Sequence, residues 1–304
     1  MKIGYNGTGL IQKASIDLIV EDAKSAQADG FSSYWIAEHP SGGFDALTVL
    51  AIVGQTVKDI ELGTAIVPTF PRHPMVLAGQ TLTTQSAIEN QLTLGIGLSH
   101  EVMMAELGLS FEKPIRHLRE YLSILMPLLE EGKVKFNGES LSCDVELFKV
   151  AKDRPGVVVA ALGPQALKVA GARTDGTTLA WVGPKTIAEH IVPTISESAA
   201  KNGKTKPRII ATLPVCVTND PKGVREKISK MLSMYGKLPS YKAMFEREGL
   251  TEPGEVALVG SASEVEDALE GLAVAGVTDY AASIFGTSKD EYVATREVLM
   301  NFRK

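Results

Sequence analysis

Short runs of continuous apolar residues alternate with longer amphipathic segments along the whole chain. The first complete block spans residues 60–100: residues 60–67 are apolar and β-branched, residues 75–87 suit a helix, and residues 91–97 form a second apolar run. A short run that is apolar on both faces is typical of a strand buried in a parallel sheet. Two such strands joined by a helix form a βαβ unit, whose crossover is almost always right-handed.

The same alternation continues through the chain and predicts its architecture. Strands are predicted at residues 2–5, 33–37, 60–67, 91–97, 156–162, 177–182, 208–218 and 279–285, each followed by a helix or a helix-bearing connection. Local helix signals include Ser15 as an N-cap, Pro164 at a first helical position and a capping box from Ser263 to Glu266. No switch in strand order is visible, so we expect a closed TIM-like (β/α)8 barrel rather than an open sheet.

The prediction is one domain over residues 1–304, with excursions near residues 101–150 and 236–262. Residues 133–150 contain short alternating stretches such as KVKFNG, which indicate a hairpin-like excursion outside the main sheet. The loops at residues 6–14, 101–113 and 236–262 are expected to shape a substrate pocket, because loops at the strand ends of such barrels carry their binding sites.

Composition restricts the class of protein. The chain has 304 residues, of which 44% are hydrophobic and 22% charged, and a net charge of −5, which argues against a nucleic-acid partner. No run approaches the ~18 apolar residues of a membrane span, and the start of the chain does not read as a signal peptide. Cys143 and Cys216 have no metal or redox spacing, and we expect reduced thiols in a cytoplasmic protein.

Polar residues gather directly after predicted strands, where parallel barrels carry their chemistry. Glu38 and His39 follow the second strand, and His100 follows the fourth. A histidine in this position can exchange a proton near neutral pH, although a loop histidine without a role fits His39 equally well. His73 precedes a predicted helix and is better explained as a cap. No HExxH, His-x-His or acidic ligand pair accompanies the histidines, so no metal is expected.

The segment Leu162–Gly163–Pro164–Gln165 stands between a predicted strand and a helix. A glycine there lets a ligand approach free backbone N–H groups, and the helix N-terminus favours an anion, although an ordinary βα turn is an equal alternative. Gly95-x-Gly97 lacks the third glycine of a dinucleotide fingerprint, and neither a nucleophile elbow nor a phosphate loop is present. The residues alone therefore predict a barrel enzyme that binds an anionic cofactor or substrate.

Several segments resemble the luciferase-like monooxygenase superfamily. They are FSSYWIAEH, IELGTAIVPTFPRHPMVLAGQ, LTLGIGLSH, VVVAALGPQALKVAGARTDG and GLAVAGVTDY, and together they extend over nearly the whole chain. The resemblance favours the branch that uses the 5-deazaflavin coenzyme F420 rather than FMN. It implies a bacterial luciferase-like barrel with the cofactor across the carboxyl ends of its strands, a small-molecule substrate and a homodimer.

The resemblance also implies roles for individual residues. His39 matches the active-site histidine of the family, and Glu38 matches the residue before it that contacts the cofactor. A bulge in the third strand often holds a non-prolyl cis peptide against the ring in this family, and the backbone after the fifth strand binds the cofactor phosphate. The residues implied to contact the cofactor are Glu38, His39, Ala65, Ile66, Leu98, Ser99, Leu162 and Gly163.

One departure from the family affects the expected reaction. Relatives that oxidise a sugar phosphate carry a catalytic glutamate where this chain has His100, so glucose 6-phosphate is not the expected substrate. We hypothesise that F420 exchanges a hydride with a small organic substrate while His39 or His100 handles the proton, His100 donating it in a reductase. Two alternatives stay open: an FMN-dependent monooxygenase that uses reduced flavin and oxygen, and a flavin- or deazaflavin-binding protein without turnover.

Overall fold

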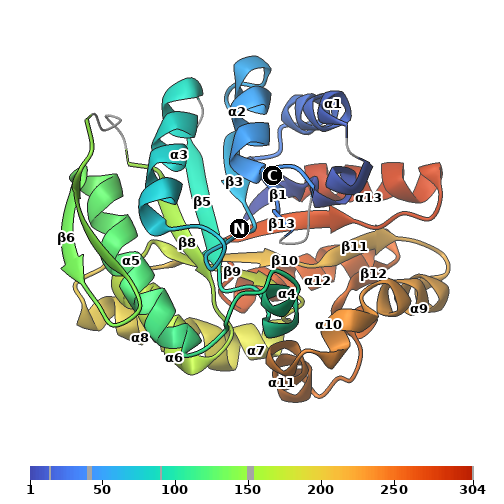
Figure 1. The fold of residues 1–304 in the computed structure, drawn as a ribbon. Coiled ribbons are helices and arrows are strands. Elements are labelled where there is room, and N and C mark those ends of the chain that lie inside the picture. The colour runs from blue at the N-terminus through green and yellow to red at the C-terminus, as the bar shows by residue number, and fades with distance from the viewer. Residues whose placement is uncertain (14, 40–42, 90, 149–153, 303–304) are drawn as a thin grey trace.

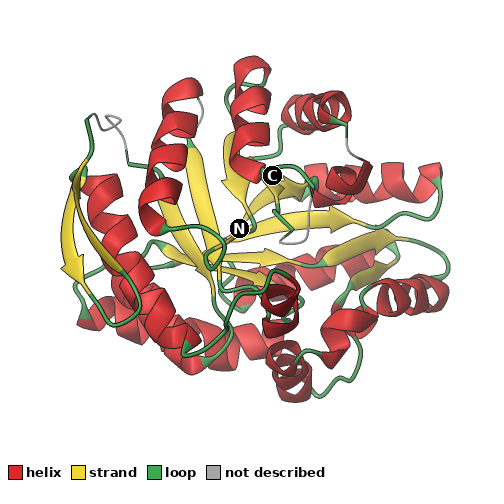
Figure 2. Ribbon diagram, viewed as in Figure 1, coloured by secondary structure: helices red, strands yellow, loops and turns green. Residues whose placement is uncertain are grey.

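Parallel strands close into a barrel that helices surround (Figures 1 and 2). The computed structural model describes residues 1–13, 15–39, 43–89, 91–148 and 154–302. Strand β1 pairs with β13, with Lys2 opposite Asp279, and this pairing closes the ring. The predicted TIM-like (β/α)8 barrel is confirmed. In spatial order the barrel strands are β1 (Lys2–Asn6), β2 (Ser33–Ile36), β3 (Glu61–Thr64), β5 (Leu92–Gly97), β8 (Gly156–Ala160), β9 (Gly176–Ala180), β10 (Arg208–Thr212) and β13 (Asp279–Ile284).

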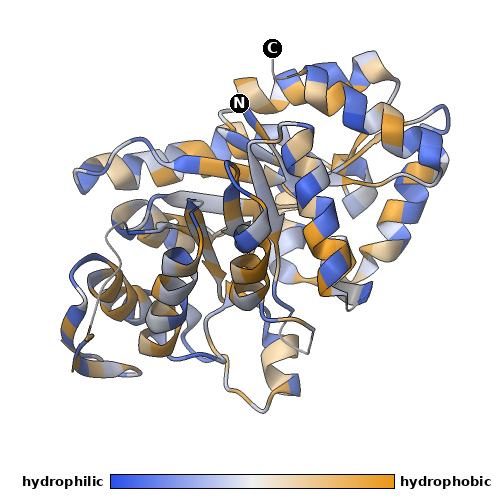
Figure 3. Ribbon diagram, turned by 90° about the horizontal axis from the view of Figure 1, so that it is seen from above, coloured by the Kyte–Doolittle hydropathy of each residue, from blue (hydrophilic) through white to orange (hydrophobic). Residues whose placement is uncertain are grey.

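Amphipathic helices cover the outside of the barrel, and hydrophobic and hydrophilic residues alternate along them (Figure 3). Ser15 caps the first helix as predicted, because its side chain accepts a hydrogen bond from Leu18 N. The predicted Ser263–Glu266 capping box is wrong by two residues: Ser261 is the N-cap and Glu264 its partner, since Gly260 ends a strand directly before Ser261. The longer helices are α1 (Ile16–Ala28), α2 (Ala46–Thr56), α3 (Pro74–Ala87), α5 (Pro114–Glu130), α6 (Pro164–Arg173), α8 (Val192–Lys201), α9 (Pro221–Met231), α12 (Ala262–Val274) and α13 (Lys289–Asn301).

Strand β3 breaks before it reaches the carboxyl end of the barrel. It stops at Thr64 and resumes as β4 (Val67–Pro68), which pairs with β5. The Ala65–Ile66 peptide bond between them is cis, as the family resemblance implied. Thr64 Oγ1 accepts from Gly95 N and donates to Gly95 O, both at 2.8 Å, so buried backbone groups beside the break stay paired. A Cβ at position 95 would overlap Thr64 O, which explains glycine at this place.

The two excursions differ in how well the sequence predicts them. Strands β6 (Lys133–Asn137) and β7 (Ser142–Glu146) form the predicted hairpin beside the barrel (Figure 1). The second excursion is more regular than expected: it holds α10 (Ser233–Lys237), α11 (Pro239–Glu248), the 3₁₀ turn η3 (Pro253–Val256) and β12 (Leu258–Gly260), which pairs with β11 (Pro214–Val217). Residues 14, 149 and 150 of the predicted loops and excursions lie outside the described residues.

The barrel interior is filled by side chains rather than open. Trp35, Val158, Ile210 and Ala281 form a buried cluster inside it, and half-buried Ala65 packs against this cluster. Ala65 follows the end of β3, so it covers the interior at the carboxyl end of the strands. A larger apolar core lies between the strands and the outer helices. No helix in the described part of the chain is long and apolar enough to cross a membrane.

Candidate active site

The predicted site residues follow adjacent strands of the barrel. Register places Pro68 opposite Gly97, and Ile96 opposite Val159, so the ends of β4, β5 and β8 lie side by side. The same edge receives the residues after β2, which pairs with β3. The structure therefore brings to one end of the barrel Glu38 and His39 after β2, Ala65 and Ile66 at the break, Leu98, Ser99 and His100 after β5, and Leu162 and Gly163 after β8.

The Ala65–Ile66 segment is fixed by backbone hydrogen bonds to the end of β2. Ala65 N donates to Ile36 O at 2.8 Å, and Glu38 N donates to Ile66 O at 3.0 Å. The Ala65 side chain rests on the barrel-interior cluster. This arrangement makes a small, apolar and rigid floor at the carboxyl end of the barrel, which suits the face of a flat ring.

The Glu38 carboxylate is held by Arg72, a residue after the third predicted strand to which the sequence reasoning assigned no role. Arg72 Nη2 donates to Glu38 Oε1 at 3.0 Å and to Asp45 Oδ2 at 2.9 Å. Glu38 Oε2 accepts from Ala46 N at 3.2 Å, at the start of α2. Burial raises the pKa of Glu38, while Arg72 and the Ala46 amide oppose that shift. Glu38 thus ties the loop after β2 to the turn after β4.

The histidines of the sequence analysis occupy different environments. His39 is exposed at the end of the β2 segment. His73 caps α3, because its Nδ1 accepts from Met75 N at 3.2 Å, which confirms the structural interpretation. His100 is half-buried at the N-cap position of the short helix α4 (Glu101–Glu106), and burial lowers its pKa.

Three aromatic side chains gather beside His100. The His100 ring lies 5.6 Å from the Tyr241 ring and 6.4 Å from the Tyr235 ring, measured between centroids. Tyr235 lies 5.3 Å from Tyr241 and 5.7 Å from Trp181, which directly follows β9. We call His100, Trp181, Tyr235 and Tyr241 the aromatic cluster. Trp181 and Tyr235 were missed by the sequence reasoning, while Tyr241 lies in a loop region that it assigned to the substrate pocket.

Two helices of the barrel begin with the same Gly-Pro pair, and only one of them is capped by a side chain. The short helix α7 (Pro184–Thr186) is capped by Glu248 of α11, whose carboxylate accepts from Lys185 N at 3.1 Å, Thr186 N at 2.8 Å and Thr186 Oγ1 at 2.6 Å. Helix α6, which begins at Gly163–Pro164, has no side-chain cap among the described residues. A Cβ at Gly163 would meet no atom within 4 Å. The start of α6 is therefore open to an anion from outside the chain.

A histidine side chain fixes the orientation of the backbone at the start of α6. His190 Nε2 lies 2.8 Å from Leu162 O, so this nitrogen carries the proton and donates it. His190 belongs to the π-helical turn η2 (Ile187–Ile191) that follows α7. Because Leu162 O and Gly163 N–H belong to one planar peptide unit, this hydrogen bond fixes the direction of the Gly163 N–H.

A second histidine that sequence reasoning missed packs near the turn after β4. His117 on α5 stacks on Phe70, with ring centroids 3.9 Å apart and planes 9° apart, and its Nε2 lies 3.1 Å from Thr69 Oγ1. Burial lowers the pKa of His117 to about 4, and Glu120 partly opposes this shift. No strand-end signal points to His117, because it lies inside a helix.

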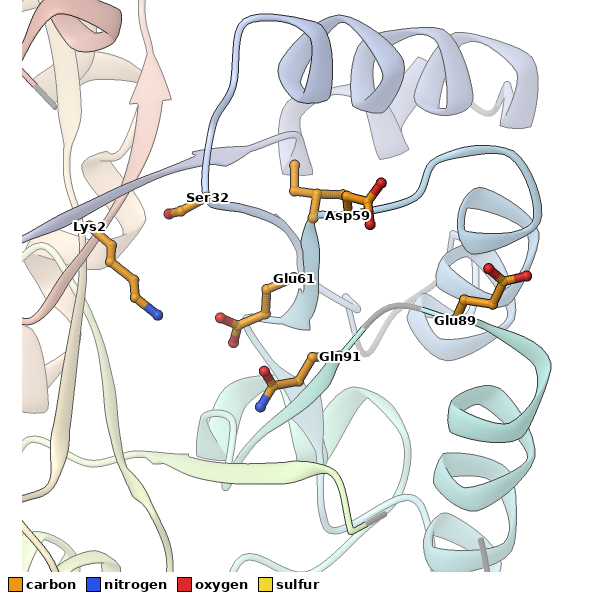
Figure 4. A pocket seen from close by; sticks show the side chains of 7 residues that line it. Lys2, Ser32, Asp59, Glu61, Glu89 and Gln91 are labelled. Atoms are coloured by element: carbon orange, nitrogen blue, oxygen red, sulfur yellow. The ribbon is translucent and has the colours of Figure 1, made fainter. Parts of the chain in front are cut away.

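The opposite end of the barrel carries a depression of a different kind. It is lined by residues at the amino ends of strands, and the side chains of Lys2, Glu61 and Gln91 face a common space (Figure 4). In such barrels, residues at this end of the strands usually contribute to fold stability and not to catalysis. Within the described residues, no group of three or more His, Cys, Asp or Glu side chains is placed to hold a metal ion.

Comparison with known proteins gives consistent matches. Residues 3–283 match the family described as luciferase-like monooxygenase. The chain is 25% identical over 285 residues to 5,10-methylenetetrahydromethanopterin reductase of Methanolobus tindarius, covering 92% of this chain and 86% of the relative. It is 28% identical over 242 residues to F420-dependent glucose-6-phosphate dehydrogenase of Beutenbergia cavernae, covering 74% of this chain and 70% of the relative. The structure of the coenzyme F420-dependent tetrahydromethanopterin reductase of Methanopyrus kandleri superimposes with a TM-score of 0.83 at 20% identity, covering 98% and 97%.

Proposed function

The chain belongs to the luciferase-like monooxygenase family, and from that premise we propose that it is an oxidoreductase that uses coenzyme F420. Relatives that match most of the chain are F420-dependent enzymes by name. The observation that carries the proposal is the placement of an apolar floor at Ala65–Ile66 and an uncapped helix start at Gly163 at the same end of the barrel, with β5 between them. Coenzyme F420 joins a flat deazaflavin ring to a phosphate-bearing tail, and these two features match its two ends.

The residues at this end of the barrel can hold such a molecule from several sides. Ala65 and Ile66 support the ring face, and Glu38, His39, Leu98 and Ser99 border it. The amide groups at Leu162 and Gly163, together with the positive end of α6, hold the phosphate. The Glu248 carboxylate on α7 illustrates within the same chain how an anion binds a Gly-Pro helix start.

The chemistry follows from this placement. When bound, the deazaflavin would give or accept a hydride at C5, in exchange with a carbon of a small organic substrate. The chain keeps ring and substrate in near-attack geometry, and His39 or His100 transfers the accompanying proton. Burial lowers the pKa of His100, so near neutral pH its ring offers one N–H donor and one lone pair at the edge of the site.

Equilibrium binding of the purified protein to coenzyme F420 and, separately, to FMN tests the proposal through fluorescence quenching. We expect tight F420 binding and weak FMN binding. Tight FMN binding with weak F420 binding would move the protein to the oxygen-using branch of the family. Tight F420 binding with no turnover across a broad substrate panel would instead favour a binding protein.

A pair of variants at one position tests the phosphate site. Gly163→Asp supplies a carboxylate that caps α6 itself, so F420 affinity should fall at least about tenfold, since like charges repel at the phosphate position. Gly163→Ala is the matched control, because its Cβ meets no neighbouring atom, and it should bind F420 within about threefold of the original chain. Equal affinity of the Asp variant and the original chain would contradict the assignment.

A further inference from the structure

We propose that the aromatic cluster is the substrate-binding wall of the site and that it selects uncharged, planar, conjugated molecules that carry a hydrogen-bond acceptor, such as aryl ketones. Trp181 Nε1 is the group that binds the acceptor. This inference deepens the proposed F420-dependent function and rests on it. It is carried by the aromatic surfaces, by the absence of a described cation in contact with them and by an unpaired donor.

The first observation is the shape of the cluster. The rings of His100, Tyr235 and Tyr241 make edge or tilted contacts with one another, at 5.3–6.4 Å between centroids. Trp181 joins them through Tyr235 at 5.7 Å. His100 and Trp181 follow barrel strands, whereas the two tyrosines belong to α10 and α11 of the excursion. The barrel and the excursion therefore meet through aromatic surfaces, which favour flat apolar partners.

The second observation concerns charge. In the described part of the chain, no salt bridge and no cation–π contact involves any of these four residues. Burial alone moves the pKa of His100 down and that of Tyr235 up, with no charged neighbour contributing. A phosphate or carboxylate packed against these rings would lose hydration there without a cation in contact with the rings, which is unfavourable. An uncharged substrate avoids that cost.

The third observation is an unpaired donor within the cluster. Trp181 Nε1 is buried and has no hydrogen-bond partner among the described residues, and the same is true of Thr212 Oγ1. The two residues are neighbours, because Trp181 N donates to Thr212 O at 3.2 Å at the ends of β9 and β10. A buried donor without an acceptor is costly, and most such groups in folded proteins find a partner. A carbonyl oxygen or imine nitrogen of a substrate supplies the acceptor that Trp181 lacks.

Calorimetric titration of the full chain, saturated with oxidised F420, tests the inference with 1-indanone, indane and glucose 6-phosphate as probes. The first two probes share a ring system and differ in the carbonyl acceptor. We expect 1-indanone to bind about tenfold more tightly than indane and glucose 6-phosphate to show no binding. Trp181→Phe should remove the preference for the ketone and leave indane binding unchanged. Tyr292→Phe is the control and should keep the preference, because it removes a hydroxyl outside the aromatic cluster, where Tyr292 contacts Tyr5.

A measurement without any variant guards against misfolding of Trp181→Phe. The chain has two tryptophans, and Trp35 is buried inside the barrel, so only Trp181 should respond to substrate. In a ¹⁵N spectrum, one of the two indole N–H signals should shift on adding 1-indanone and not on adding indane. A preference for the ketone that persists in Trp181→Phe, an indole signal that indane shifts equally, or tight glucose 6-phosphate binding would overturn the inference.

Separate titration with F420 distinguishes this inference from the proposed function. If the original chain binds F420 but shows no preference for the ketone, only the substrate inference fails. If it does not bind F420, the proposed function fails, and the substrate inference fails with it because it rests on that function.

Discussion

His100 is the residue where a single substitution reports most directly on the chemistry. We predict that His100→Ala lowers kcat by roughly 10²-fold or more, because a positioned proton donor or acceptor is lost. The F420 Kd should stay within about twofold, since the residues proposed to hold the cofactor are intact. Pre-steady-state and steady-state rates with a substrate found by screening provide the measurement, and full turnover by the variant would refute the role.

The pH dependence of the same reaction shows whether His100 donates or accepts the proton. Burial lowers the pKa of His100 below its ordinary value of 6.5. If His100 donates the proton, the rate falls as pH rises through that lowered pKa. If it accepts the proton, the rate falls as pH drops through the same value, so activity persists to a more acidic pH than an exposed histidine would allow. The limb assigned to His100 should be missing from the profile of His100→Ala.

His117 should make folding stability depend on pH. Its folded pKa of about 4 lies below the ordinary 6.5, so the unfolded chain binds more protons between these values. The contribution of His117 is therefore complete above pH 6.5 and is lost as pH falls toward 4. After allowance for solvent screening at this half-buried site, the loss is roughly 1–2 kcal/mol. Denaturant titrations at pH 7 and pH 4.5 should show a smaller pH-dependent loss of stability for His117→Gln than for the original chain.

At the scale of elements, the Glu248 cap connects the second excursion to the barrel. Its carboxylate takes hydrogen bonds from two amides and one hydroxyl at the start of α7, although it belongs to α11. The same excursion carries Tyr235 and Tyr241 of the aromatic cluster. The cap therefore determines where the aromatic surfaces stand relative to His100.

We predict that Glu248→Ala costs about 1–2 kcal/mol of local stability, since a helix cap and its charge–dipole interaction are lost together. Hydrogen exchange should accelerate in α7, α10 and α11 while the barrel strands stay protected. Glu246→Ala is a suitable control, because Glu246 is 65% exposed and its nitrogen–oxygen contact with Lys242 is 3.9 Å. Similar exchange in both variants would show that the cap does not hold the excursion.

The strands of the barrel could be predicted from sequence because each is a local signal. A buried parallel strand is a short apolar run between turn residues, and all eight predicted strands are present. The helices α4 and α10 escaped because they have only six and five residues, too few for a helical period to show. Helix α11 was also missed, although Met244 and Phe245 on it are buried. The shifted capping box at Ser261 has a similar origin, since Ser263 and Glu266 have the same spacing and only the end of β12 selects between the two pairs.

The residues of the candidate site also fall into two groups: those that a local sequence pattern predicts and those that it does not. Residues directly after strands, such as His39, His100 and Gly163, could be proposed because topology alone places them at one end of the barrel. Arg72 required knowledge that Glu38 and Asp45 lie across from it, and His117 required the packing of α5 against the turn after β4. Contacts of this kind join residues far apart in sequence, and no local pattern encodes them.

At the scale of the whole molecule, a set of partly buried ion pairs and the proposed active site occupy opposite ends of the barrel. At the amino ends of the strands, Arg208 Nη1 lies 2.7 Å from Glu61 Oε1, and Arg208 Nη2 lies 2.8 Å from Asp279 Oδ1. The ion pairs join β10 to its neighbour β13 and to β3, which is not adjacent to β10 in the barrel. Glu61 and Asp279 side chains are only 10% and 5% exposed, so their charges depend on Arg208.

We predict that Arg208→Met destabilises the protein by about 3 kcal/mol, because it leaves two buried carboxylates without their cation. Lys201→Met is the control: its pair with Glu197 is 70% and 61% exposed, and it should cost less than about 0.5 kcal/mol. Below the unfolding transition, Arg208→Met should bind F420 with a Kd within about twofold of the original chain, since the proposed cofactor residues lie at the other end of the strands. Weakened F420 binding by the folded variant would mean that the two ends are coupled through the barrel.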